Sequence, residues 1–469
     1  MATQNGNGLG FDPDELRGKR VLVYSLGIEG RDLARFMVRH GATVTVSDTR
    51  SAAQLQAAGA ALPDGVTDLV SGRPLLDPEG FDLVAVSQSV LRGNPALGRA
   101  RSLGVPMTSQ MRLFLQLCPG KTVGITGSSG KSTTTALVGA MAAAGGLDYV
   151  VGGNLGEALL GRLDDITAET TVILEISHTQ LQYTDRSPHI AAITNVTPNH
   201  LDQFSWDEYV GLKRNILTHQ TRDDIAILNA DDHSSSALAG SVAGRLVRTS
   251  IAKEPAGDAV WLDGDRIVAR RDGHVAEIAR RQQIRLRGRH NVANVVMACA
   301  LGNEAGIAPE AVRSAVAAFR GVAHRLEIVG TSDSVTWVND SIATSPERTM
   351  AGLESFTEPV VLLLGGRDKN LPLDGLRELA RGRCRAVICF GEAGPLFHEA
   401  LRGAVPTTSI VSTLEEAVAA AAALAVSGDV VLLAPAGTSF DAYPSFEVRG
   451  EAFCRLVRAL PGFNGEVPS

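Results

Sequence analysis

Three series of short apolar runs, each alternating with helix-like stretches, follow one another along the chain and constrain its fold more than any other feature. The first series is RVLVYSLG, ATVTVSD, FDLVAVS and GVPMTSQ; the second is KTVGITG, TVILEIS, IAAITNV and DIAILNADD; the third is VTWVND, PVVLLLGG, CRAVICFG and DVVLLAPAG. Short buried strands that alternate with amphipathic helices predict parallel sheets. We therefore predict an α/β protein of three doubly wound domains, spanning residues 1–107, 108–321 and 322–469.

Composition and charge argue against a nucleic-acid-binding protein and against a membrane protein. The chain has 469 residues, a formal net charge of −7 and only 4% aromatic residues. Nucleic-acid-binding surfaces are normally basic and often offer aromatic rings for stacking, so we expect no nucleic-acid partner. The first residues lack the apolar region of a signal peptide, and no run approaches the roughly 18 apolar residues of a membrane span. We expect a cytoplasmic monomer without membrane insertion.

The segment GITGSSGKSTTTALVG, which begins at Gly124, has the order of strand, glycine-rich loop and helix that a phosphate site needs. Its glycines allow close backbone approach, and its N–H groups and helix dipole favour an anion. Lys131 is placed to neutralise the β- and γ-phosphates, and Ser132 to put its hydroxyl on Mg²⁺. The candidate ATP-binding residues of this loop are Gly127, Ser128, Ser129, Gly130, Lys131, Ser132 and Thr133. A tight helix-entry turn without a ligand is the alternative interpretation.

The sequence TGSSGKST resembles the TGxxGK[ST] loop of the Mur ligases, the ATP-dependent amide ligases of peptidoglycan precursor synthesis. Other landmarks follow in the family's order, so the resemblance covers almost the whole chain. It implies a Rossmann-like first domain, a central domain of the P-loop ATPase type and a Rossmann-like third domain. It also implies an ADP-forming ligase that phosphorylates the carboxylate of UDP-N-acetylmuramoyl-L-alanine and joins the resulting acyl phosphate to D-glutamate. ATP would be the co-substrate and two Mg²⁺ ions the cofactors.

The resemblance assigns catalytic and metal-binding roles to four residues around the loop. In ILEISHTQLQ, Glu175 ends an apolar strand and would bind Mg²⁺; in ITNVTPNHLDQF, His200 would bind the second Mg²⁺. Asn199 stands where the family usually has aspartate. Lys213, in WDEYVGLKRNIL, corresponds to a lysine that most members carry as a carbamate. The expected metal site is therefore Ser132, Glu175, His200 and carbamylated Lys213, and the catalytic set adds Lys131.

Two further segments resemble the family's nucleoside-binding motifs. GRHNVANVV resembles the adenine-binding GxHNxxN and assigns Asn291 and Asn294, whose amides can donate and accept hydrogen bonds. AHRLE resembles the HRxE segment near the ribose and phosphates and assigns His324 and Arg325, and VNDSIATSPERT places Asp340 toward ATP.

The first domain carries SLGIEG after a strand, with Asp48 about 20 residues further on, as in a dinucleotide-binding fingerprint. The resemblance favours a uridine nucleotide there instead, bound in the manner of the glutamate-adding branch of the family. The family's usual SPG[IV] appears in this chain as SQSV. The residues expected to bind the UDP-sugar are Gly27, Ile28, Glu29, Gly30, Asp48, Thr49, Arg50, Asn154, Ser177 and Gln180.

The third domain is expected to hold the incoming glutamate. The matching positions are Thr344, Lys369, Ser439 and Phe446. The family's usual lysine in NDSKATN is Ile342 in this chain, and we expect Lys369 and Arg367 to compensate for the missing cation.

Other functions stay open at this point. A folylpolyglutamate synthase or a ligase for L-glutamate would use the same central chemistry, and the sequence alone does not fix the enantiomer. An NAD-dependent oxidoreductase would use SLGIEG and Asp48 but would leave the phosphate loop unexplained. A non-catalytic nucleotide sensor is a further alternative.

Overall fold

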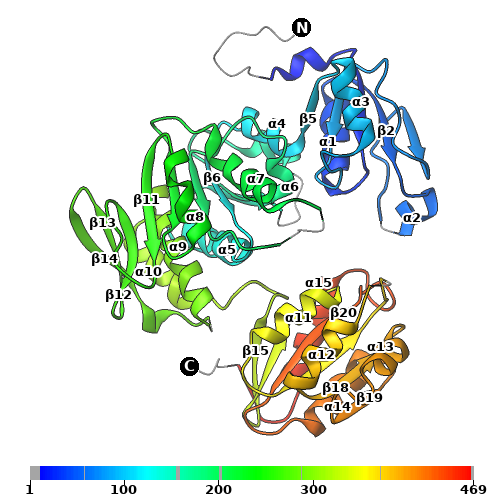
Figure 1. The fold of residues 1–469 in the computed structure, drawn as a ribbon, viewed down its shortest axis with the longest axis vertical. Coiled ribbons are helices and arrows are strands. Elements are labelled where there is room, and N and C mark those ends of the chain that lie inside the picture. The colour runs from blue at the N-terminus through cyan, green and yellow to red at the C-terminus, as the bar shows by residue number, and fades with distance from the viewer. Residues whose placement is uncertain are drawn as a thin grey trace. The chain divides into compact units, whose positions relative to one another are not determined.

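The computed structural model describes residues 11–57, 59–154, 159–199, 203–286, 288–369 and 371–465. The chain separates into two compact units, one ending at Ala318 and the other starting at Phe319. The first unit holds two sheets and the second unit holds one, and helices flank each sheet (Figure 1). The predicted α/β architecture with three mostly parallel sheets is confirmed.

The first sheet has five parallel strands in the order β3-β2-β1-β4-β5. The glycine turn that follows β1 leads into helix α1, and Asp48 is the last residue of β2, so both lie at the carboxyl edge, where open α/β sheets bind ligands. The elements are β1 (Arg20–Tyr24), α1 (Ile28–Arg39), β2 (Thr43–Asp48), α2 (Ala52–Ala57), β3 (Asp68–Ser71), β4 (Leu83–Val86), α3 (Pro95–Leu103), β5 (Met107–Ser109) and α4 (Gln110–Leu117), preceded by the 3₁₀ turn η1 (Pro13–Leu16).

The second sheet has nine strands in the order β14-β13-β12-β11-β10-β9-β6-β8-β7. Strands β6 to β12 are parallel, and β13 and β14 add an antiparallel extension. The strands are β6 (Lys121–Thr126), β7 (Tyr149–Gly153), β8 (Thr171–Glu175), β9 (Ile190–Ile193), β10 (Ile225–Asn229), β11 (Arg245–Ser250), β12 (Ala259–Asp263), β13 (Arg266–Arg271) and β14 (His274–Arg280). The helical elements are α5 (Lys131–Ala144), η2 (Leu160–Asp165), α6 (His178–Leu181), α7 (Trp206–Thr218), α8 (His233–Ala237), η3 (Leu238–Ser241), η4 (Arg281–Gln283), α9 (Arg289–Ala305) and α10 (Pro309–Ala318).

The third sheet forms the second unit, in the order β19-β18-β17-β20-β16-β15-β21. Every residue of β17 and β20 is buried, as expected for central strands covered on both faces. The elements are β15 (Glu327–Ser332), β16 (Val335–Asn339), α11 (Pro346–Glu354), β17 (Val360–Gly365), α12 (Asp374–Arg383), β18 (Cys384–Phe390), α13 (Gly394–Leu401), β19 (Thr407–Ile410), α14 (Leu414–Leu424), β20 (Val430–Ala436), α15 (Phe446–Arg458) and β21 (Phe463–Asn464).

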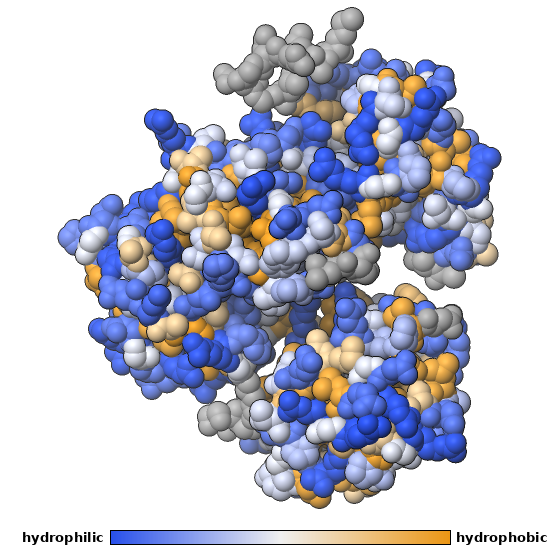
Figure 2. Space-filling view, in the orientation of Figure 1, coloured by the Kyte–Doolittle hydropathy of each residue, from blue (hydrophilic) through white to orange (hydrophobic). Residues whose placement is uncertain are grey.

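The surface mixes polar and apolar side chains on the face drawn in Figure 2. Large apolar residues with half or more of their surface exposed include Ile28 on α1, Val275 on β14 and Phe440 in the loop after β20. Isolated residues of this kind are common on protein surfaces. Within the described part of the chain, no helix combines the length and the apolar character needed to cross a membrane.

Candidate active site

The predicted phosphate loop joins β6 to α5 and adopts a conformation that requires its glycines. Gly127 and Gly130 have φ angles of 153° and 82°, and Gly130 caps the start of α5. A Cβ atom on Gly127 would collide with the hydroxyl of Thr194, and one on Gly130 with the amide oxygen of Asn294. The two glycines therefore let the loop pack against its neighbours while the first N–H groups of α5 stay available for an anion.

Residues 194–197, which follow β9, hold the loop in place. Asn195 Oδ1 accepts a hydrogen bond from the main-chain N–H of Ser129 at 3.0 Å, and Thr194 Oγ1 donates to the carbonyl of Ser129 at 2.6 Å. Ser128 Oγ donates to the carbonyl of Thr197 at 2.9 Å. The loop is thus tied to the adjacent strand end before any ligand binds.

Two lysines direct their amines at the loop. Lys131 Nζ donates to the carbonyls of Gly127 and Ser128, at 2.8 and 3.3 Å. Lys213, on α7, has only 1% of its surface exposed, and its Nζ donates to the carbonyl of Gly127 at 2.8 Å. Burial, with a smaller contribution from Lys131, lowers the pKa of the Lys213 amine well below its usual range. A neutral amine is the form that can add CO₂.

Glu175 ends β8, whose register pairs it with Ile125 of the strand that leads into the loop. The carboxylate is 2% exposed, and Asn154 Nδ2 donates to Oε1 at 2.8 Å. No donor among the described residues hydrogen-bonds to Oε2. A buried carboxylate oxygen without a partner is costly, and Mg²⁺ prefers oxygen ligands of this kind. Glu175 therefore fits a metal ligand, and Ser132 is buried at the start of the neighbouring helix.

The rest of the expected metal site is less complete. His200 lies outside the described residues. Among the residues that are described, no group of three or more histidine, cysteine, aspartate or glutamate side chains could hold a metal ion. Of the four residues expected at the metal site, the structure describes Ser132, Glu175 and Lys213.

Asn291 and Asn294 lie one helical turn apart on α9. Asn294 Nδ2 donates to Asn291 Oδ1 at 3.1 Å, and Asn294 packs on Gly130 of the loop. The structure therefore brings these two predicted residues to the phosphate loop, although about 160 residues separate them in the sequence.

The first sheet carries the predicted uridine-nucleotide residues around Asp48. Asp48 Oδ2 accepts hydrogen bonds from Leu26 N at 2.7 Å and Arg50 Nη2 at 2.7 Å, and Oδ1 accepts from Arg50 Nε at 3.0 Å. Burial tends to raise the pKa of Asp48, but the hydrogen bonds from Arg50 and Leu26 outweigh it and lower the pKa to about 2. Both carboxylate oxygens thus serve to fix the turn and Arg50.

Ser25 occupies the first position of the glycine fingerprint and nevertheless has a φ of 74°, a conformation that normally favours glycine. A Cβ on Gly30 would overlap the carbonyl of Ser25, so α1 approaches the turn as closely as in a glycine-rich nucleotide loop. Gly27 is the N-cap of α1, and Ile28 is half exposed beside it.

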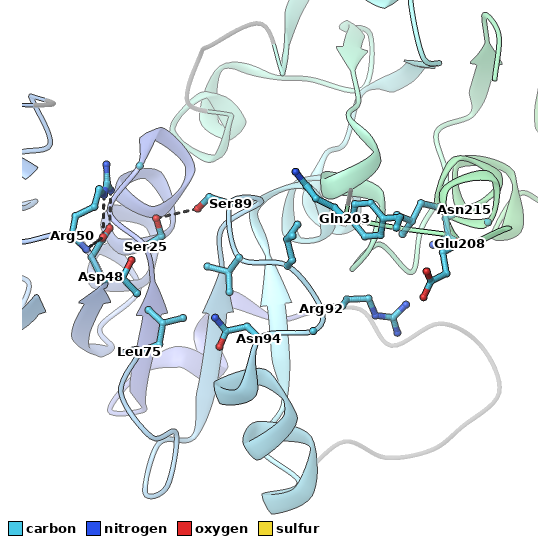
Figure 3. A pocket seen from close by; sticks show the side chains of 18 of the residues that line it. Ser25, Asp48, Arg50, Leu75, Ser89, Arg92, Asn94, Gln203, Glu208 and Asn215 are labelled. Carbon is cyan, nitrogen blue, oxygen red and sulfur yellow. Dashed lines mark hydrogen bonds and ion pairs between the residues drawn. The ribbon is translucent and has the colours of Figure 1, made fainter. Parts of the chain in front are cut away.

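A cavity of about 1070 Å³ opens at this edge of the first sheet (Figure 3). Gly27, Asp48, Thr49 and Arg50 line one side, and the chain leading into α7 and α7 itself line the other. The residues that we did not predict include Arg92 and Asn94 after β4 and Glu208, Arg214 and Asn215 on α7. As ordinary polar residues of a loop and a helix, they carry no motif that could have identified them.

The remaining predicted UDP-sugar residues lie close together but outside the lining of this cavity. Glu29, Ser177 and Gln180 join Gln88 in a closed ring of hydrogen bonds, described below, and Asn154 contacts Glu175.

In the second unit, the predicted glutamate-binding residues surround the ends of β16, β17 and β20. Lys369 Nζ donates to Thr344 Oγ1 at 3.1 Å. Ser439 is buried, and Phe446 begins α15. Buried Arg449 joins two of these segments, because its guanidinium donates to the carbonyls of Ser341 and Gly437, at 2.9 and 3.2 Å.

His324, Arg325 and Asp340 lie at the start of the same unit. The His324 main-chain N–H donates to Glu327 Oε2 at 2.8 Å, and Asp340 Oδ1 accepts from Leu326 N at 3.1 Å. Asp340 is buried, and burial raises its pKa to about 6.

Comparison with known proteins identifies the family. Residues 125–302 match the Mur ligase middle domain, and residues 324–437 match the Mur ligase glutamate ligase domain. A UDP-N-acetylmuramoylalanine–D-glutamate ligase from Symbiobacterium thermophilum is 40% identical over 447 residues, 94% of this chain and 98% of that protein. The chain belongs to the Mur ligase family.

Other Mur ligases agree with this assignment. A protein of the same name from Acidobacterium capsulatum is 40% identical over 96% of this chain and 98% of its own, and one from Clostridium botulinum is 35% identical over 95% and 98%. The crystal structure of UDP-N-acetylmuramate-alanine ligase from Thermotoga maritima matches with a TM-score of 0.53 at 19% identity, covering 93% of this chain and 98% of that chain. This structural likeness supports the fold.

The departures from Mur ligase motifs now have a structural context. Gln88 stands where the family usually has proline, and its main-chain N–H, which a proline would lack, donates to Glu29 Oε2 at 2.7 Å. Ile342 replaces the usual lysine and is half-buried, and Arg348 Nη1 donates to its carbonyl at 3.3 Å. Arg348, six positions further along the same segment, is a cation to which we assigned no role from the sequence. Arg367, which we expected to compensate, forms an ion pair with Glu392 at 3.0 Å.

Proposed function

We propose that the protein is an ATP-dependent ligase that adds D-glutamate to UDP-N-acetylmuramoyl-L-alanine, a step of peptidoglycan synthesis that we place in the cytoplasm. The observation that carries this proposal is the identity of about 40% with UDP-N-acetylmuramoylalanine–D-glutamate ligases over nearly the full length of both chains. The phosphate loop with the unpartnered oxygen of Glu175 beside its strand supports the same activity.

In this proposal each of three segments binds a different substrate. Residues 1–107 bind the UDP-sugar, residues 108–321 bind ATP and Mg²⁺, and residues 322–469 bind glutamate. In the first unit, the cavity edged by Asp48, Thr49 and Arg50 is suited in size and polarity to a uridine nucleotide. Gly27 to Gly30 would approach its diphosphate at the N-terminus of α1.

Catalysis rests on positioning and charge rather than on a side-chain nucleophile. The loop N–H groups and Lys131 hold the β- and γ-phosphates, and Asn291 and Asn294 contact the adenine. The carboxylate oxygen of the alanyl group attacks the γ-phosphorus, and ADP leaves. The glutamate amine then attacks the acyl carbon, phosphate leaves, and the amine loses a proton.

Glu175, Ser132, His200 and carbamylated Lys213 would hold two Mg²⁺ ions, which would neutralise phosphate charge. The burial of Lys213 at the loop supports its modification. On the glutamate side, Thr344, Lys369, Ser439 and Phe446 would position the amino acid, and the contact between Thr344 and Lys369 supports a shared carboxylate site. His324, Arg325 and Asp340 would contact the ribose and phosphates.

The deciding experiment measures phosphate release with Mg·ATP, UDP-N-acetylmuramoyl-L-alanine and each glutamate enantiomer. We expect release to require all three substrates and to be much faster with D-glutamate. If phosphate were released with L-glutamate but not with D-glutamate, the proposed acceptor would be wrong. Phosphate release without the UDP-sugar would contradict the proposed ligase activity.

A further inference from the structure

We propose that Gln88 is a positioning residue of the ligase: it ties the wall of the UDP-sugar cavity to the segment that follows Glu175. This inference rests on the proposed function and deepens it. Gln88 belongs to no predicted site, and its role follows from the hydrogen bonds that it makes on both sides of the boundary between the first two sheets.

Four residues form a closed ring of hydrogen bonds. Gln88 N donates to Glu29 Oε2 at 2.7 Å, and Gln180 Nε2 donates to Glu29 Oε1 at 2.7 Å. Ser177 N donates to Gln180 Oε1 at 2.9 Å, and Ser177 Oγ donates back to Gln88 Oε1 at 2.8 Å. Thr179 Oγ1 adds a second donor to Gln88 Oε1 at 3.1 Å. Within the ring, both oxygens of Glu29 and the side-chain oxygens of Gln88 and Gln180 are satisfied.

The ring spans elements from two sheets. Glu29 lies in the first turn of α1, and Gln88 follows β4, whereas Ser177 and Gln180 follow β8 and begin α6. Glu29, Ser177 and Gln180 are buried. In a buried network with its groups satisfied, each bond depends on the others, so the ring fixes the two strand ends relative to each other.

The two ends of the ring lead to different parts of the proposed site. Ser89 and Val90, directly after Gln88, line the cavity, and Ser89 Oγ donates to Ser25 Oγ at 3.1 Å. Ser177 lies two residues after Glu175, the predicted metal ligand beside the phosphate loop. Gln88 is the ring member whose main chain binds one side, through Glu29, while its side chain binds the other, through Ser177 and Thr179.

This placement has a direct consequence for the reaction. The substrate carboxylate must approach the γ-phosphate in line, and a misplacement of about 1 Å can cost roughly 100-fold in rate. The ring connects the part of the protein that would hold the uridine nucleotide to the part that would hold the phosphate. Loss of the Gln88 amide should therefore impair transfer to the UDP-sugar without affecting the binding of ATP.

The test compares Gln88→Met, which keeps the length of the side chain but removes the acceptor oxygen, with Gln56→Met, a matched change at an exposed position of α2. We expect Gln88→Met to lower kcat/KM for UDP-N-acetylmuramoyl-L-alanine about tenfold or more. The KM for ATP and the melting temperature should stay close to those of the wild type. Gln56→Met should match the wild type in all three quantities.

A second set of variants tests whether Gln88 acts through Ser177 and Thr179. In a background that carries both Ser177→Ala and Thr179→Val, Gln88→Met should have no further effect on kcat/KM, because both hydroxyl donors to Gln88 Oε1 are already gone. Independent, multiplying effects of the background and of Gln88→Met would overturn the proposal. A Gln88→Met enzyme with the kinetic constants of the wild type would also overturn the proposal. The same holds if Gln88→Met lowers the melting temperature but leaves kcat/KM unchanged.

Hydrogen exchange separates this proposal from the proposed function. Without any substrate, Gln88→Met should speed amide exchange in residues 176–181 relative to the wild type and to Gln56→Met. Unchanged exchange would overturn the positioning role. A wild-type protein that releases no phosphate with the stated substrates would overturn the proposed function, whatever the exchange result.

Discussion

Lys131 and Lys213 aim their amines at the same acceptor, the carbonyl oxygen of Gly127, and each Nζ lies 2.8 Å from it. Two protonated amines at one neutral oxygen would repel each other, and burial and the charge of Lys131 lower the pKa of Lys213. A phosphate group at the loop, or conversion of one amine into an anion, would relieve this repulsion. The two amines therefore make the loop a favourable place for an anion.

Replacing Lys131 with methionine should nearly abolish ligation. The side chain keeps much of its volume but no longer stabilises charge on the transferring phosphate, and the loss of one such group typically costs about 100- to 1000-fold in kcat. Phosphate release under saturating substrates measures the effect. Lys253→Met, at an exposed lysine of the same unit, is the control and should keep full activity. Near-normal activity of Lys131→Met would contradict the proposed role of the loop in phosphate transfer.

Lys213→Ala should also be inactive, but for a different reason, because it removes the side chain that we propose becomes a carbamate. Small carboxylates such as acetate or formate should restore part of its activity by supplying an anion in the space left by the side chain. Lys131→Met should gain nothing from the same additives. Activity of Lys213→Ala that does not respond to any short carboxylate would contradict the carbamate.

Thr344 and Lys369 should act together on the glutamate substrate, since Lys369 Nζ already contacts Thr344 Oγ1 at 3.1 Å. A hydrogen bond to a charged group is worth about 1.5–3 kcal/mol, so Lys369→Met should raise the KM for glutamate about tenfold or more. The KM for the UDP-sugar should not change. Arg402→Met, which removes an exposed cation of the same unit, serves as the control. Equal KM values for glutamate in the two variants would argue against this site.

Asp340 should make the folded protein less stable as the pH rises. Burial raises its folded-state pKa to about 6, above the unfolded value near 3.8, so its contribution is fully present below pH 3.8 and is lost as the pH passes through 6. At pH 8, Asp340→Asn should thus have a melting temperature equal to or higher than that of the wild type. At pH 4, where the carboxyl of the wild type is protonated in the fold, any such gain in melting temperature should disappear. The variant should still lose ligase activity. A lower melting temperature than that of the wild type at pH 8 would show that the ionised carboxylate is stabilising.

The sequence predicted the parts of the fold and site that depend on local patterns. The apolar runs at β1, β6, β9, β17 and β20 identified central strands, because such strands are buried on both faces. The phosphate loop was visible for a similar reason, since its glycines and Lys131 are consecutive.

The parts that were missed depend on contacts between distant segments. Strands β13 and β14, with Arg266 and Arg280 at their ends, mix apolar and charged residues on a sheet extension and did not resemble the core strands. The ring that joins Glu29 to Gln180 spans 151 positions, and no local pattern marks either residue as a partner of the other.

The contact between Gly130 and Asn294 restricts the order in which these positions can change during evolution. The space that any side chain at position 130 would need is filled by an amide oxygen from α9, and the φ of 82° disfavours other residues as well. A lineage could substitute the glycine only after position 294 had become smaller, which would give up the hydrogen bond to Asn291. We therefore expect homologues to substitute the glycine at position 130 only where position 294 carries a residue smaller than asparagine.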